Sequence, residues 1–316
     1  MFDSLPFLIL RTARPRQWIK NLALYAALVF SGFFFFTPQE GLPYAVTVTY
    51  AFGIFCILTS SVYIINDIID YEADAKHPFK KKRPIASGKL PIPVAVFTAI
   101  AGLTMVFFLS LWLSGFFRLL ILSYLCLQVL YAKVTKHIPI LDVVSIATGF
   151  LIRIYAGAVV VNLHMSVWFL LTVVSASLFL AVGKRQSERT LMAGKVLGET
   201  RKALKGYSER LLDQYTGMFA NATWLTYALF TFQNEVVRPD ERLADFYTIL
   251  PRTLQSQKLL MLTLPFVIFG VMRYLQLVYE SNEGESPERV LLSDKPLLLT
   301  TFMFGASVMV VIYFLS

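Results

Sequence analysis

The sequence is poor in charged residues and in cysteine. Charged side chains make up 16% of the 316 residues, whereas ordinary soluble domains contain roughly 25%. The two cysteines, Cys56 and Cys126, both fall within apolar runs, so we expect neither a disulfide framework nor a cysteine-ligated metal site. These shortages argue against a soluble globular domain and against a disulfide-stabilised scaffold.

Long hydrophobic runs take the place of the missing charge. Hydrophobic residues reach 56% of the chain, and mean hydropathy is +0.62. A membrane-spanning helix needs about 20 largely apolar residues, and an open sheet cannot satisfy its backbone in lipid. We therefore predict an all-α integral membrane protein in which residues 1–316 form one polytopic domain. The nine predicted spans cover residues 19–37, 46–66, 92–113, 117–134, 139–161, 165–183, 211–233, 256–275 and 297–315.

Basic residues are distributed unevenly between the predicted loops. Of the 29 Lys and Arg residues, 23 lie in the N-terminal segment and every second loop, 5 lie in the other loops, and Arg153 lies inside a span. Because Lys and Arg accumulate on the cytoplasmic side, we expect a cytoplasmic N-terminus and an external C-terminus. Anionic lipids and anionic substrates account for the net charge of +9, which requires no nucleic-acid partner.

An acidic cluster follows the second predicted span directly. Asp67, Asp70 and Asp74 are spaced i, i+3, i+7, so on a helix they share one face. Three carboxylates on one face repel each other unless a cation lies between them, and oxygen ligands select a hard cation such as Mg²⁺. The basic run 76–83 would then bind substrate phosphates. The alternative is a solvated acidic loop beside cytoplasmic positive charges, but carboxylates at a membrane boundary favour a functional site.

Polar residues also gather in residues 14–21, before the first predicted span, and at Asp142 and Arg153 in the fifth. Residues 14–21 are equally consistent with an interfacial tryptophan among positive-inside charges. Asp142 and Arg153 are about three helical turns apart, too far to pair directly. We expect each to have a partner on another helix, and an Arg inside a span to face the bundle interior or a wet cavity. A buried ion pair that only fixes helix packing is the alternative.

A third cluster of polar residues, 183–189, lies at the cytoplasmic end of the sixth predicted span. Lys184, Arg185 and Glu188 are nearest the membrane and are the residues that we expect to turn inward. Glu188 would either add a carboxylate to a metal site or orient Arg185, and the sequence leaves both possibilities open. A solvated cytoplasmic loop explains most of the charges that follow.

These features together resemble the UbiA superfamily of intramembrane prenyltransferases. The resemblance covers almost the whole chain and rests on the nine spans, on the segment 131–136, and on the motif Asn66-Asp67-x-x-Asp70-x-x-x-Asp74. It implies a helical bundle with a polar cavity open to the cytoplasm. Two aspartate-rich motifs usually bind Mg²⁺ and a prenyl diphosphate in this superfamily, and most members transfer the prenyl group to an aromatic acceptor.

The sequence departs from that pattern where the second aspartate motif is expected, because it has the basic motif Gly183-Lys184-Arg185-x-x-Glu188 there. With Arg14-Pro15-x-Gln17-Trp18-x-Lys20-Asn21, this variant is similar to the decaprenyl-phosphate phosphoribosyltransferase branch, known from arabinan wall biosynthesis in actinobacteria. Ser166-x-Trp168 and the segments 265–274 and 293–297 also match. The resemblance implies phosphoribosyl pyrophosphate (PRPP) as donor and a polyprenyl phosphate as acceptor.

The resemblance also assigns roles to residues. Asp67, Asp70 and Asp74 would hold Mg²⁺, while Lys80 and Arg83 would assist the leaving pyrophosphate. The other expected phosphate-binding residues are Asn66, Lys20, Lys76, His77, Lys136, Lys184, Arg185 and Glu188. Lys184 and Arg185 would supply positive charge for a donor and an acceptor that both carry phosphate, because guanidinium and ammonium groups bind phosphate well.

We expect inversion at C1 of the ribose with no general base, because a phosphate acceptor is already ionised at neutral pH. Two other readings stay open: an aromatic prenyltransferase that shares the first Mg²⁺ site, and a nonenzymatic membrane protein or transporter. Small residues such as those at 156–158 pack helices within one chain or between chains, so a homo-oligomer also stays open.

Overall fold

The computed structural model describes residues 4–76, 80–192, 204, 206–233, 258–280 and 287–315, and all regular elements in this part are helices. The chain divides into two compact units. The first comprises residues 1–28, 33–133 and 152–163, and the second comprises residues 29–32, 134–151 and 164–316.

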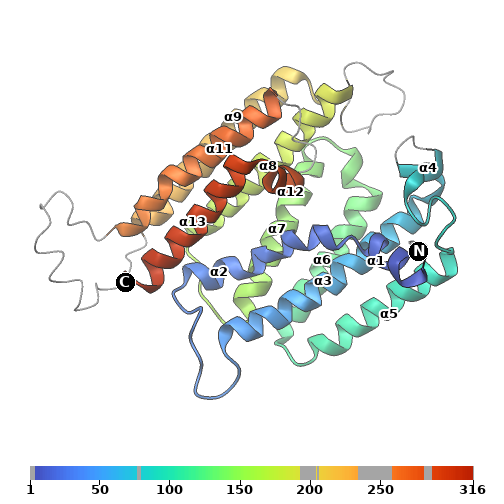
Figure 1. Ribbon diagram of the computed structural model, residues 1–316, viewed down its shortest axis with the longest axis horizontal. Helices are drawn as coiled ribbons and strands as arrows, with labels where there is room; N and C mark the ends of the chain where they lie inside the picture. The colour runs from blue at the N-terminus through green and yellow to red at the C-terminus, as the bar shows by residue number, and fades with distance from the viewer. Residues whose placement is uncertain are drawn as a thin grey trace, which may run out of the picture. The chain divides into compact units, whose positions relative to one another are not determined.

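The first unit is built around the long helix α3, which packs along α5 and also contacts α1 and η1 (Figure 1). Pro43 and Pro91 precede α3 and α5, where a residue without a backbone N–H costs nothing. A buried apolar cluster includes Leu28, Phe55 and Phe117. The elements are α1 (Leu5–Ala13), η1 (Pro15–Leu24), the start of α2 (Tyr25–Phe30), α3 (Tyr44–Ile69), α4 (Tyr71–Lys76), η2 (Lys80–Lys82), α5 (Ile92–Ser110), α6 (Gly115–Lys133) and the C-terminal part of α7 (Leu141–Val160).

Small residues allow helices of the first unit to approach closely. A Cβ atom on Gly157 would lie 1.8 Å from the carbonyl oxygen of Leu24, so α7 and η1 meet backbone to backbone at this point. Ala156 and Ala158, on either side, are buried. The small-residue stretch 156–158 therefore packs within this chain.

The second unit contains two closely packed helix pairs, α8 with α9 and α11 with α13 (Figure 1). Asp294 accepts a hydrogen bond from the backbone N–H of Leu297 at 2.9 Å and so caps α13. Arg273 of α11 donates to the same carboxylate at 2.7 and 3.2 Å, which ties the two helices together. The elements are η3 (Thr135–His137), the N-terminal part of α7, α8 (Val167–Met192), α9 (Glu209–Gln233), η6 (Leu259–Thr263), α11 (Leu264–Tyr279), α12 (Pro287–Ser293) and α13 (Lys295–Tyr313).

Seven helical segments in the described residues are long and apolar enough to cross a membrane: Tyr44–Ile69, Ile92–Ser110, Gly115–Lys133, Leu141–Val160, Val167–Thr190, Leu259–Tyr279 and Lys295–Tyr313. The predicted span 19–37 falls on η1 and α2, and α2 ends at Phe30. The predicted span 211–233 falls on α9, which has 25 residues but a more polar composition. A count of nine spans and the sidedness of the membrane therefore stay predictions.

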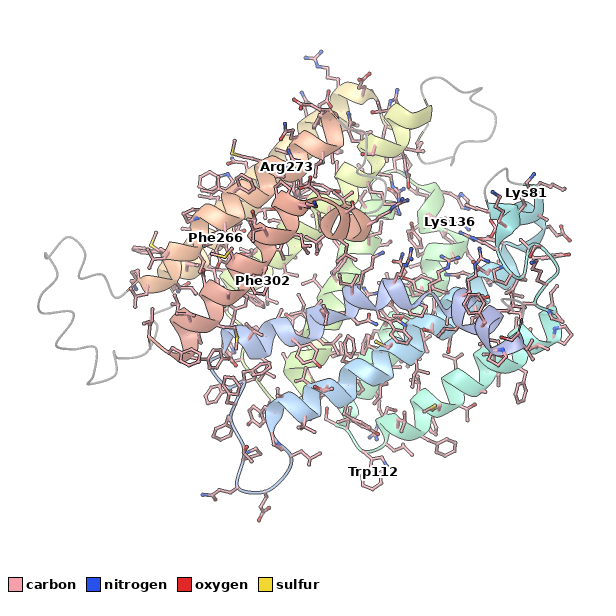
Figure 2. All side chains as sticks on the ribbon, in the orientation of Figure 1. Lys81, Trp112, Lys136, Phe266, Arg273 and Phe302 are labelled. Atoms are coloured by element: carbon pink, nitrogen blue, oxygen red, sulfur yellow. The ribbon has the colours of Figure 1, made fainter. Side chains whose placement is uncertain are left out.

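Large apolar side chains remain exposed on the candidate spans. Trp112, between α5 and α6, is 87% exposed and projects outward (Figure 2). Phe97 of α5 and Phe302 of α13 are also largely exposed. Tryptophan is enriched at membrane–water interfaces, and exposed apolar side chains on spanning helices are the surface that lipid covers. The exposed surface therefore agrees with the apolar composition.

Candidate functional site

A polar pocket of about 260 Å³ lies in the first unit, where α1, the end of α3 and the η2 segment meet. We call it the basic pocket because five of its lining side chains are cationic. Lys81, in η2, marks this segment in Figure 2. The lining residues are Arg11, Thr12, Arg14, Asp67, Lys80, Lys82, Arg83 and Pro84.

Two buried carboxylates and two arginines form the centre of this arrangement. The side chains of Asp67 and Asp74 are each 4% exposed, whereas those of Arg14 and Arg83 are each 29% exposed. Arg14 Nη2 binds Asp67 Oδ1, and Arg83 Nη1 binds the same oxygen at 3.0 Å and also binds Asp74 Oδ2. Lys80 Nζ lies 3.8 Å from Asp74 Oδ1. A single guanidinium nitrogen therefore lies between the two carboxylates.

Local backbone structure brings these side chains together. Asp67 is in the last turn of α3. The backbone N–H of Asp74, in α4, donates to the carbonyl of Asp70 at 2.8 Å, and this hydrogen bond links the end of α3 to α4. Arg14 lies between α1 and η1, directly before Pro15, with a left-handed φ of 54°. The α conformation is disfavoured before proline, so α1 ends here. The guanidinium of Arg14 also lies over the ring of Tyr63, 5.2 Å from its centroid.

The predicted three-aspartate metal site is only partly assembled. Among the described residues, no group of three or more His, Cys, Asp or Glu side chains is placed to hold a metal ion. Asp67 and Asp74 converge on Arg83, while Asp70 lies half-buried at the C-terminal end of α3. The donor chemistry nevertheless fits a hard cation, because two buried carboxylates surround one positive group and offer only oxygen ligands. The role of Asp70 as a third ligand stays a prediction.

Sequence reasoning located part of the basic pocket. Lys80 and Arg83, predicted to assist the leaving pyrophosphate, line it, but the lining does not include Asn66, Lys20 or Lys76. Asn66 and Lys20 are half-buried on α3 and η1, and Lys76 is exposed at the end of α4. His77 lies outside the described residues. Lys82 belongs to the basic run 76–83 that was expected to bind phosphates, whereas the sequence assigned no role to Arg11 or Arg14, although Arg14 begins the Arg14-Pro15 motif.

Arg153 has buried partners within the first unit, as expected for an arginine inside a span. Its Nε donates to Asn21 Oδ1 at 3.0 Å, and its Nη2 donates to the hydroxyl of Tyr124 at 2.7 Å. Asn21 in turn donates to the hydroxyl of Thr59 at 3.2 Å, and Trp18 Nε1 donates to the hydroxyl of Ser60 at 3.0 Å. Residues 18–21 are thus held against α3 by side-chain hydrogen bonds, which a tryptophan lying free at the interface would not make.

The second unit holds its own charged cluster, which we call the Arg185 cluster: Asp142, Lys184, Arg185, Glu188 and Tyr207. Arg185 is fully buried, and its Nε donates to Asp142 Oδ2 at 2.6 Å. Its Nη1 binds Glu188, and Lys184 Nζ lies 4.0 Å from the same carboxylate. Glu188 therefore orients Arg185, one of the two roles that the sequence left open.

The two cations of this motif, Lys184 and Arg185, differ in burial. The side chain of Arg185 is 0% exposed and that of Lys184 is 33% exposed, so Lys184 is the one that a ligand can reach without rearrangement. The prediction that Asp142 pairs with a residue on another helix is confirmed by its contact with Arg185 of α8. Lys136 is half-buried in η3 of the same unit.

Tyr207 is a member of this cluster that sequence reasoning did not identify. Its hydroxyl donates to Asp142 Oδ1 at 2.7 Å and accepts from the backbone N–H of Ile140 at 2.6 Å. Ile140 has a left-handed φ of 71°, which is strained for a β-branched residue. Burial, followed by the nearby Asp142 carboxylate, raises the pKa of Tyr207 above its usual range. The hydroxyl therefore stays protonated and continues to donate to Asp142.

Apolar helices and two clusters of buried ion pairs define an integral membrane protein that carries paired charges inside its helical units. The chain belongs to the UbiA prenyltransferase family, whose model matches residues 23–196. It is 34% identical to decaprenyl-phosphate phosphoribosyltransferase of Mycolicibacterium smegmatis, over 97% of this chain and 92% of the relative. It is 32% identical to the enzyme of the same name from Corynebacterium glutamicum, over 96% of this chain and 86% of the relative.

The fold is similar to that of solved proteins, one of them a UbiA homolog. A UbiA homolog from Archaeoglobus fulgidus bound to GPP and Mg²⁺ superimposes with a TM-score of 0.65 at 19% identity, over 96% of this chain and 99% of that one. A structure of digeranylgeranylglyceryl phosphate synthase gives a TM-score of 0.61 at 17% identity, over 96% of both chains. These likenesses confirm the predicted fold family.

Proposed function

We propose that this protein transfers the 5-phosphoribosyl group of PRPP to a membrane polyprenyl phosphate and releases pyrophosphate. The observation that carries the proposal is similarity over nearly the full length to two decaprenyl-phosphate phosphoribosyltransferases. The basic pocket supports it, because five cations around two buried carboxylates suit a ligand with several phosphate charges and a divalent cation. The product would enter cell-wall biosynthesis.

In the first unit, Asp67 and Asp74 would hold Mg²⁺, with Asp70 as a third candidate ligand. When bound, Mg²⁺ neutralises charge on the pyrophosphate of the donor. Arg14, Lys80 and Arg83 bind phosphate oxygens, for which the arginine fork is well suited. These residues hold the donor so that its C1–pyrophosphate bond is exposed to the acceptor.

In the transfer itself, the bond between C1 and the pyrophosphate oxygen breaks as a bond from C1 to an oxygen of the lipid phosphate forms. The ribose is oxocarbenium-like in between, as in glycosidic cleavage, and the anomeric centre is inverted. The acceptor oxygen is already ionised, so no residue needs to remove a proton. In the second unit, Lys184 and Lys136 are the further candidates to bind a phosphate oxygen, and Glu188, whose carboxylate lies 4.0 Å from Lys184 Nζ, positions Lys184.

We further propose that the chain crosses the bacterial inner membrane nine times, with η1–α2 and α9 adding to the seven apolar helices. The uneven distribution of Lys and Arg favours a cytoplasmic N-terminus and an external C-terminus. On this topology the basic pocket, which includes Arg11 and Lys82, faces the cytoplasm, where PRPP is available.

The test uses full-length protein in detergent with Mg²⁺, a polyprenyl phosphate and radiolabelled PRPP, and it follows label into the organic phase. We expect transfer that requires Mg²⁺ and is lost in Asp67→Asn. Lys295→Gln, at the start of α13, is a control that leaves the basic pocket unchanged. Absence of label, together with transfer from a prenyl diphosphate to an aromatic acid, would replace this proposal with the prenyltransferase reading.

A further inference from the structure

Arg14 and Arg83 bind the two carboxylates that the proposed function assigns to a metal ion. Both guanidinium groups contact Asp67 Oδ1, and Arg83 reaches Asp74 with the same nitrogen. A divalent cation between Asp67 and Asp74 would occupy the position of this nitrogen. Metal binding between these two carboxylates therefore competes with their contacts to Arg83.

The same two arginines line the pocket beside these carboxylates. Both side chains are 29% exposed, whereas the carboxylates are 4% exposed, so an incoming ligand can reach the arginines more readily than the carboxylates. Arg binds phosphate and carboxylate with the same planar fork of N–H donors. A phosphate group that enters the pocket can therefore replace the carboxylates as the hydrogen-bond partner of these arginines.

We propose that Arg14 and Arg83 exchange partners when the donor binds. Without the donor they neutralise Asp67 and Asp74, and with it they bind its phosphate oxygens while the divalent cation takes the carboxylates. The inference rests on the proposed function, which supplies the donor. Donor binding draws the arginines away from the carboxylates, and metal binding to the carboxylates releases the arginines for the donor. Metal and donor therefore bind cooperatively, and each raises the affinity for the other by the same factor.

This exchange predicts that removing an arginine from an anion-binding pocket improves metal binding. The test measures Mn²⁺ binding, in place of Mg²⁺, to full-length protein in detergent without donor, by the paramagnetic resonance signal of free Mn²⁺. We expect Arg83→Gln to bind Mn²⁺ at least about fivefold more tightly than wild type, the lower end of typical coupling. Arg14→Gln should show a smaller gain, because Arg14 pairs with only one of the two carboxylates, that of Asp67.

Lys82→Gln is the matched control, since Lys82 lines the same pocket and forms no ion pair with either carboxylate among the described residues. It measures how much the loss of one positive charge from the pocket by itself changes the affinity for Mn²⁺. Adding Asp67→Asn to Arg83→Gln should abolish the gain and so assign the bound Mn²⁺ to this site.

Equal Mn²⁺ affinity in wild type, Arg14→Gln and Arg83→Gln would overturn the exchange, and so would a gain in Lys82→Gln as large as that in Arg83→Gln. If Arg83→Gln does not fold, the Mn²⁺ affinities of Arg14→Gln and Lys82→Gln are compared instead, and equal affinities would overturn the exchange. Mn²⁺ binding is measured without PRPP, so a wild-type protein that transfers no label would refute the proposed function and leave this result standing.

Discussion

Replacing Tyr207 with phenylalanine tests whether the Arg185 cluster depends on one hydroxyl. The change removes the donor to Asp142 Oδ1 and the acceptor for the N–H of Ile140, and it leaves the ring in place. A hydrogen bond to a charged group contributes about 1.5–3 kcal/mol, and a buried group left unsatisfied costs about 1–3 kcal/mol. Since Tyr207 is 1% exposed, water cannot replace the lost bonds without rearrangement. We expect a loss of roughly 2–4 kcal/mol in unfolding free energy.

The measurement is the melting temperature in detergent, followed by kcat and KM for PRPP and for the polyprenyl phosphate. We expect Tyr207→Phe to melt several degrees lower and to raise KM, because Asp142 then holds Arg185 less firmly. Tyr215→Phe is the matched control, since Tyr215 is half-buried on α9 and its hydroxyl makes no hydrogen bond among the described residues. Equal melting temperatures in the two variants would refute the reasoning.

Four further changes have outcomes that the contacts predict. Asp294→Ala removes the cap of α13 and its ion pair with α11, and should cost about 1 kcal/mol from the cap alone. The Arg273 hydrogen bonds lower the pKa of Asp294, so the difference in melting temperature from wild type should be full at neutral pH and shrink as pH falls through that lowered pKa. Gly157→Ala forces a methyl group into a backbone carbonyl and should abolish stable folded protein, as judged by gel filtration. Arg185→Gln leaves the buried Asp142 carboxylate without its ion-pair partner and should destabilise by about 3–5 kcal/mol, whereas Lys184→Gln should leave the melting temperature nearly unchanged and lower transfer.

The helices could be predicted from hydrophobic runs alone, since seven of the predicted spans coincide with long apolar helices. The first predicted span was read as a single helix over 19–37, whereas the structure has a 3₁₀ segment and a short α-helix that ends at Phe30. Pro15 and the polar side chains that follow it favour this break, and Asn21 bonds to α3 and Arg153 rather than facing lipid. Hydropathy averages over a window and cannot detect such side-chain partners.

The carboxylates of the candidate site could be predicted from the sequence, but their ion pairs with Arg14 and Arg83 could not. The spacing of Asp67 and Asp74 placed them on one face, and the structure brings them to one arginine. Arg14 lies 53 residues from Asp67 in the chain, and no local pattern encodes a contact over that separation. Tyr207 was equally hidden, because a tyrosine in a polar loop carries no signal until the burial around it is known.

The distribution of charge differs from the one that the motifs suggested. The basic motif at 184–185 was expected to supply positive charge for phosphate, yet Arg185 is compensated by Asp142 and by Glu188, which also lies near Lys184. Two cations and two carboxylates leave the Arg185 cluster without net charge. The basic pocket has five lining cations against Asp67 and the adjoining Asp74, so its charge is strongly positive. Because a multiply charged anion is drawn to net charge rather than to paired charge, the first unit is the part of the chain in which the phosphate groups of a donor are held most strongly.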